Sequence, residues 1–71
     1  MRTVESIELD ERQLRLFWSS IRDDYPMVTI EQCRESAARI KAGNRDQENV
    51  IDVLMYLNIK TAVDELNERN V

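Results

Sequence analysis

The chain contains no histidine and only one cysteine among its 71 residues. Without histidine, the usual general base for a serine or cysteine nucleophile is missing. One cysteine cannot close an internal disulfide, and no familiar zinc or haem ligand set can be assembled around it. Carboxylates alone could hold calcium or magnesium, but no loop has the residue spacing of an EF-hand. We therefore expect no metal, no cofactor and no enzymatic activity.

The chain also lacks an excess of positive charge and any long apolar run. Ten Lys and Arg stand against fourteen Asp and Glu, which gives a formal net charge of −4. This balance argues against broad electrostatic attraction to nucleic acids or anionic membranes. No apolar run approaches membrane-spanning length, and residues 1–9 contain no apolar segment typical of a secretion signal. We expect a cytoplasmic protein with no membrane partner.

Two helix starts are marked by polar pairs. Asp10 and Gln13 have the spacing of a capping box, in which each side chain accepts a hydrogen bond from the backbone of the other residue. Thr29 and Gln32 repeat the arrangement. An apolar periodicity typical of helices follows each pair. The sequence therefore predicts two helices that begin at these caps.

Single residues predict where the helices end. Pro26 disfavours helical geometry at the preceding residue, and Gly43 suits the left-handed position that follows a helix. Asn58 interrupts the apolar pattern of a third, longer helix and marks a predicted kink or break. The predicted fold is a single all-α domain over residues 1–71, with an N-terminal arm or strand (1–9) and helices at 10–23, 29–42 and 45–68.

The third predicted helix has two apolar faces. Its first half places Val50, Val53, Leu54 and Leu57 on one side, and its second half places the apolar residues Tyr56, Ile59, Ala62, Val63 and Leu66 on the other. One helix with two apolar faces needs two partners. The rest of the chain supplies one, and a second copy or another protein supplies the other. We predict a symmetric homodimer that forms through the later part of this helix.

Aromatic residues add a second possible anchor. Phe17 and Trp18 give the first helix a wide aromatic face, of which one ring can enter the core and the other can take part in binding. Met55 and Tyr56 lie where the second apolar face of the third helix begins. The predicted protein interface comprises Trp18, Met55, Tyr56, Ile59, Val63 and Leu66.

Cys33 is predicted to be a core residue and not a nucleophile. It lies in line with Ile30, Ala37 and Ile40 on the apolar side of the second helix. The neighbouring Arg34 is adjacent in sequence and therefore does not face it.

Nucleic-acid binding is the alternative function. The second and third helices are separated by a short turn that contains glycine, as in a helix-turn-helix, and a ribbon-helix-helix fold is the other option. The cations near the turn are Arg34, Arg39, Lys41 and Arg45. Acidic residues argue against both versions. The start of the predicted recognition helix carries Asp46, Glu48 and Asp52, and the segment that would form the ribbon carries Glu5 and Glu8.

The sequence thus favours a small non-enzymatic regulator, adaptor or inhibitor that binds another protein. Its size and acidity resemble those of small phage proteins that inhibit a host enzyme, so a phage or bacterial modulator of a host protein is one form of this prediction. Its mechanism would be steric or allosteric, with apolar anchors giving affinity and acidic side chains giving orientation.

Overall fold

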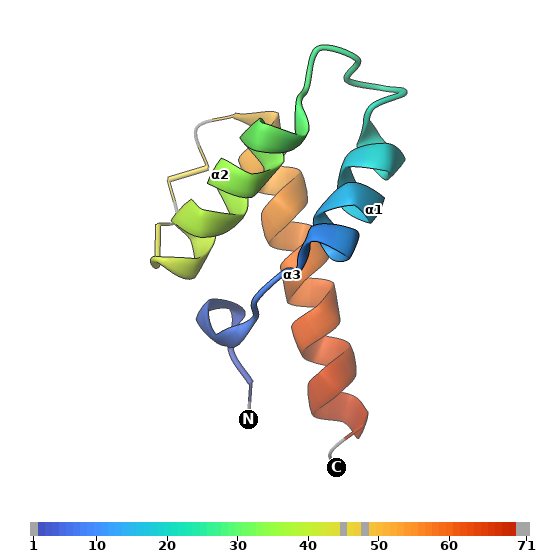
Figure 1. The fold of residues 1–71 in the computed structure, drawn as a ribbon. Coiled ribbons are helices and arrows are strands. Elements are labelled where there is room, and N and C mark those ends of the chain that lie inside the picture. The colour runs from blue at the N-terminus through green and yellow to red at the C-terminus, as the bar shows by residue number, and fades with distance from the viewer. Residues whose placement is uncertain (1, 45, 48, 70–71) are drawn as a thin grey trace.

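The computed structural model describes residues 2–44, 46–47 and 49–69. The elements in chain order are η1 (Val4–Ser6), α1 (Glu11–Ile21), α2 (Ile30–Lys41) and α3 (Val50–Arg69) (Figure 1). Within these residues the chain is all-helical and compact, as predicted, and has no strand. The segment predicted as an arm or strand contains one turn of 3₁₀ helix. A homodimer stays a prediction.

Both capping boxes form at the predicted starts of α1 and α2. The Asp10 carboxylate accepts a hydrogen bond from the Gln13 backbone N–H (2.8 Å), and the Gln13 side chain accepts one from the Asp10 N–H (2.9 Å). Thr29 and Gln32 make the equivalent pair at 3.2 and 2.9 Å. These bonds satisfy backbone donors that the first turn of a helix leaves unpaired, so both helix starts are fixed locally.

The third helix begins later than residue 45. Gln47 has a φ of 40°, a left-handed conformation that is incompatible with a continuing α-helix. The Asn49 side chain then accepts a hydrogen bond from the Asp52 backbone N–H at 3.1 Å and caps α3. Once started, α3 runs without a break through Asn58 to Arg69. Gly43 adopts a φ of 93° just after α2, as expected for a helix C-terminus.

The core lies between the three α-helices and η1. The N-terminal segment contributes Val4, and α3 extends past α1 and α2 beside η1 (Figure 1). Two hydrogen bonds join the Arg2 backbone to the Asn67 side chain, at 2.9 and 3.1 Å. The buried apolar cluster comprises Val4, Leu14, Phe17, Ile21, Cys33, Ile40, Met55, Ile59 and Val63.

The two apolar faces of α3 have the opposite roles to those expected. Met55, Ile59 and Val63 are buried in the core. Val50, Val53 and Leu57 are exposed. The reason is length: with Ile51, the buried residues form a stripe at i, i+4 spacing that covers about four turns, whereas the exposed residues cover about two. The longer stripe buries more apolar area, so it packs inward.

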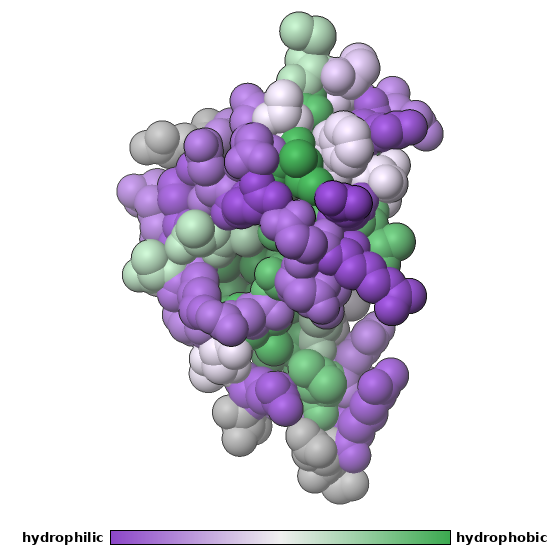
Figure 2. All heavy atoms as spheres, in the orientation of Figure 1, coloured by the Kyte–Doolittle hydropathy of each residue, from purple (hydrophilic) through white to green (hydrophobic). Residues whose placement is uncertain are grey.

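The face of the molecule shown in Figure 2 is mostly hydrophilic. On the side seen in Figure 2, apolar atoms form a band down the middle of the molecule, with hydrophilic side chains on both sides. Across the residues that the structure describes, no helix combines the length and the apolar character needed to cross a membrane.

Candidate functional site

A buried polar cluster joins α2 to α3. Asp52 is 6% exposed and accepts hydrogen bonds from the Ser36 hydroxyl and from Arg39 Nη2, both at 2.6 Å. Ser36 is fully buried. A serine beside a carboxylate superficially resembles part of a catalytic triad, but the chain has no histidine to relay the proton. The cluster therefore has a structural role and fixes how α2 and α3 pack.

Cys33 is fully buried in the core. Burial raises the pKa of its thiol above the ordinary value of 9.0, because the thiolate would lose its hydration. The neutral thiol then predominates at pH 7, and a nucleophilic role is disfavoured.

We expect Cys33 to be protected from thiol reagents in the folded protein. Ellman's reagent reaches it only when the domain opens, and a small domain of this kind is stable by about 3–5 kcal/mol. Labelling in native buffer should therefore be slower than in 6 M guanidinium by about 100-fold or more. Similar rates in the two solvents would show that the thiol is accessible in the native state.

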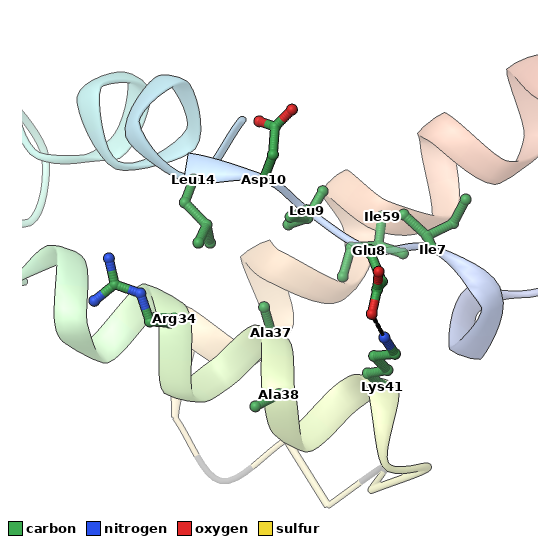
Figure 3. A pocket seen from close by; sticks show the side chains of 10 residues that line it. All are labelled: Ile7, Glu8, Leu9, Asp10, Leu14, Arg34, Ala37, Ala38, Lys41 and Ile59. Carbon is green, nitrogen blue, oxygen red and sulfur yellow. Dashed lines mark hydrogen bonds and ion pairs between the residues drawn. The ribbon is translucent and has the colours of Figure 1, made fainter. Parts of the chain in front are cut away.

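A hollow of about 520 Å³ lies between the N-terminal segment, α1 and α2 (Figure 3). Its apolar walls include Ile7, Leu9 and Leu14, and Ile59 of α3 lies at its back. An ion pair between Glu8 and Lys41 crosses it. Lys41 lowers the pKa of Glu8, mainly through its hydrogen bond to the carboxylate and secondly through Coulombic attraction. This ion pair is therefore present at neutral pH and is lost on acidification through that lowered pKa.

The size of the hollow is in the range of ligand pockets, about 300–1,000 Å³, but its charged groups serve the fold. Glu8 and Lys41 pair with each other, and Asp10 caps α1. Arg34 hydrogen-bonds to Glu31 and to Glu11, and these two bonds raise the pKa of Arg34. Since no set of polar groups converges on the hollow, we assign it no substrate.

The predicted nucleic-acid patch is largely neutralised. Arg34 pairs with Glu11 and Glu31, and Lys41 pairs with Glu8. Arg39 pairs with Asp52. Arg45 lies outside the described residues. Three of the four predicted cations thus face carboxylates of their own chain, which weakens their attraction to phosphate groups.

The residues of the predicted protein interface are divided between the core and its edge. Met55, Ile59 and Val63 pack in the core, while Tyr56 and Leu66 are half-buried. Trp18 is half-buried too: its indole N–H donates to the Val28 carbonyl at 2.9 Å, and the Arg22 guanidinium lies 5.1 Å from the ring centroid. An interface role for this set stays a prediction, and its buried members are already used within one chain.

The largest apolar group left exposed on a single helix lies on the other side of α3. Val50 is 41% exposed, Val53 36% and Leu57 55%, and the half-buried Leu54 lies beside them. We call these four residues the outer face of α3. The sequence revealed this face through its helical spacing but could not show which of the two faces of the helix packs inward. Several apolar residues on adjacent turns are typical of a binding surface.

No group of three or more His, Cys, Asp or Glu gathers in a metal-binding arrangement within the described part of the chain. In the same part, every buried side-chain nitrogen and oxygen has a hydrogen-bond partner. Comparison with protein-family models, with curated proteins and with solved structures finds no match.

Proposed function

We propose that this protein is a small non-enzymatic regulator, adaptor or inhibitor that acts in the cytoplasm by binding a polypeptide. The outer face of α3 carries the proposal. The core closes around the opposite side of α3 without using Val50, Val53 or Leu57. Their exposure is therefore not explained by folding, whereas binding to a polypeptide would bury them.

The energetics support this role. Full burial of one Val or Leu side chain contributes about 1.5–3 kcal/mol, so completing the burial of three half-exposed ones contributes several kcal/mol before association costs. The chemical groups that an enzyme would need are committed elsewhere. Ser36 and Asp52 bond to each other, and Cys33 is buried as a neutral thiol.

Site-specific photocrosslinking tests this function in cells that express the chain. A benzophenone amino acid at Leu57 should yield a discrete adduct, since Leu57 is the most exposed residue of the outer face of α3. The matched control carries the same group at Glu35, an exposed position on α2. An adduct at twice the 8.4 kDa chain mass identifies a second copy, and any other mass identifies a different protein.

Equal crosslinking at Leu57 and Glu35, or none at either position, would contradict a binding role for the outer face of α3. Both variants place the new group on the exposed surface, so the fold is retained in each. Circular dichroism of the purified variants checks this.

A further inference from the structure

The outward side of α1 carries cations that the fold does not neutralise. Arg12 and Arg15 form no ion pair within the described residues, and the neighbouring Leu16 is 61% exposed. Ser19 lies one turn further along the same side. We call Arg12, Arg15, Leu16 and Ser19 the cationic face of α1. In a chain of net charge −4, it offers an exposed apolar side chain next to two positive charges.

Negatively charged side chains follow the outer face of α3 toward the C-terminal end of the helix. Beyond Leu57 the same side of the helix carries Asp64, Glu65 and Glu68, which we call the acidic end of α3. Asp64 pairs with Lys60 at 2.8 Å, and this hydrogen bond raises the pKa of Lys60. Glu65 and Glu68 have no ion-pair partner in the part of the chain that the structure describes. Leu57 thus lies about two turns before the unpaired carboxylates of α3, with the Lys60–Asp64 pair between them, and Leu16 lies one turn after the cation Arg12 on α1.

Helix stability does not account for these charges. Arg12 lies in the first turn of α1, where the helix dipole favours negative side chains. Glu68 lies in the last turn of α3, where the dipole favours positive ones. Both placements are unfavourable for the helix that carries them, which is expected of groups placed for an interaction.

We propose that the outer face and acidic end of α3 dock on the cationic face of α1 of a second copy of this chain. An antiparallel arrangement places Leu57 against Leu16. From the contact between Leu57 and Leu16, Arg12 lies about 6 Å toward the start of α1, at 1.5 Å per residue. Glu65 lies about 12 Å toward the end of α3, which in this arrangement is the same direction. The long arginine side chain spans the difference. Each copy carries both surfaces, so the contact can repeat from copy to copy; it closes into a dimer if a two-fold axis relates the copies and otherwise continues head to tail.

This inference rests on the proposed function and names the partner of the same surface. Charge complementarity favours a second copy, because one exposed helix face of this chain carries unpaired cations and another ends in unpaired carboxylates. In a parallel, in-register pair of α3 helices, by contrast, the acidic ends would lie against each other and repel.

Charge reversal tests the contact with the purified protein, by light scattering coupled to size-exclusion chromatography over a dilution series. One variant carries Arg12→Glu with Arg15→Glu, and the other carries Glu65→Lys with Glu68→Lys. Each should raise the dissociation constant about tenfold or more, since attraction becomes repulsion. A mixture of the two variants in equal amounts should associate again. The unchanged α3 of the first variant matches the unchanged α1 of the second, and their two reversed surfaces carry opposite charges.

The control Asp24→Lys with Glu35→Lys changes the net charge as much as the second variant does but lies on other elements. It should leave the dissociation constant within about threefold of the unmodified chain. The reversals themselves should not unfold the protein, because Glu at the start of α1 and Lys at the end of α3 both suit the helix dipoles.

A monomer at all concentrations would overturn this inference. So would association that survives both reversals, or a mixture of the two variants that stays monomeric. If the chain is monomeric in solution while Leu57 crosslinks to a different protein in cells, the proposed function holds and only the self-association fails. A monomer with no specific crosslink at Leu57 contradicts both.

Discussion

Met55→Ala is expected to leave most of the protein unfolded at 25 °C. Met55 is fully buried at the middle of the stripe that α3 turns toward the core. Replacing a buried methionine with alanine costs about 2–5 kcal/mol through lost apolar burial and the cavity left behind. A domain of about 70 residues has only about 3–5 kcal/mol of stability in total. The loss is therefore comparable to the whole free energy of unfolding.

Urea denaturation followed by circular dichroism measures this effect. Leu57→Ala is the matched control, because Leu57 lies on the same helix and is more than half exposed. It should change the free energy of unfolding by about 0.5 kcal/mol or less. Equal stability of the two variants would contradict the assignment of the inner and outer faces of α3.

The same assignment rules out Ile59 as a position at which an introduced charge could test binding. This side chain is 2% exposed and belongs to the core. Ile59→Asp would bury an unpaired carboxylate and unfold the chain, so it cannot report on binding. Leu57 and Val53 are the positions at which a polar substitution separates binding from folding.

Asp52→Ala should give the second largest effect, a loss of about 1–3 kcal/mol in the free energy of unfolding. Asp52 is the shared acceptor for the Ser36 hydroxyl and for Arg39. Removing it leaves the fully buried Ser36 hydroxyl without that acceptor, and an unsatisfied buried donor carries a desolvation cost of this size. The Arg39 side chain is 40% exposed, so water compensates for much of its lost pairing.

A double-mutant cycle with Ser36→Ala isolates the contribution of the hydrogen bond. Because Ser36→Ala removes the donor together with the acceptor, the double variant should be more stable than the sum of the two single losses implies, by about 1 kcal/mol. Asp52→Asn keeps an oxygen acceptor and should lose less than Asp52→Ala. Strict additivity of the two alanine substitutions would show that the Ser36–Asp52 bond contributes nothing to stability.

The sequence predicted those features that depend on neighbouring residues. Capping boxes at Asp10 and Thr29 act within one turn, so local spacing reveals them. The all-helical class and the two apolar faces of α3 follow from periodicity alone. The side of α3 that packs inward could not be predicted, because periodicity shows that two apolar faces exist and not which one the other helices cover.

The parts that were missed depend on contacts between distant residues. Arg34 and Lys41 suggest a basic patch in the sequence, but Glu11 and Glu8 pair with them from more than twenty residues away. The later start of α3 follows from the left-handed conformation of Gln47, which no local residue pattern indicated. The protein-binding role itself was predicted from the sequence and stays a proposal.

The hydrogen bonds between Arg2 and Asn67 have a consequence for the order of folding. They join residues 65 positions apart, so they close a loop that includes nearly the whole described chain. The entropic cost of closure grows with loop length, whereas α2 and α3 are consecutive and pack across a short connection. Contacts between α2 and α3 are therefore favoured early in folding, and docking of the N-terminal segment is favoured late. In the native state, we expect the same segment to open before the α2–α3 pair separates, which amide hydrogen exchange would measure.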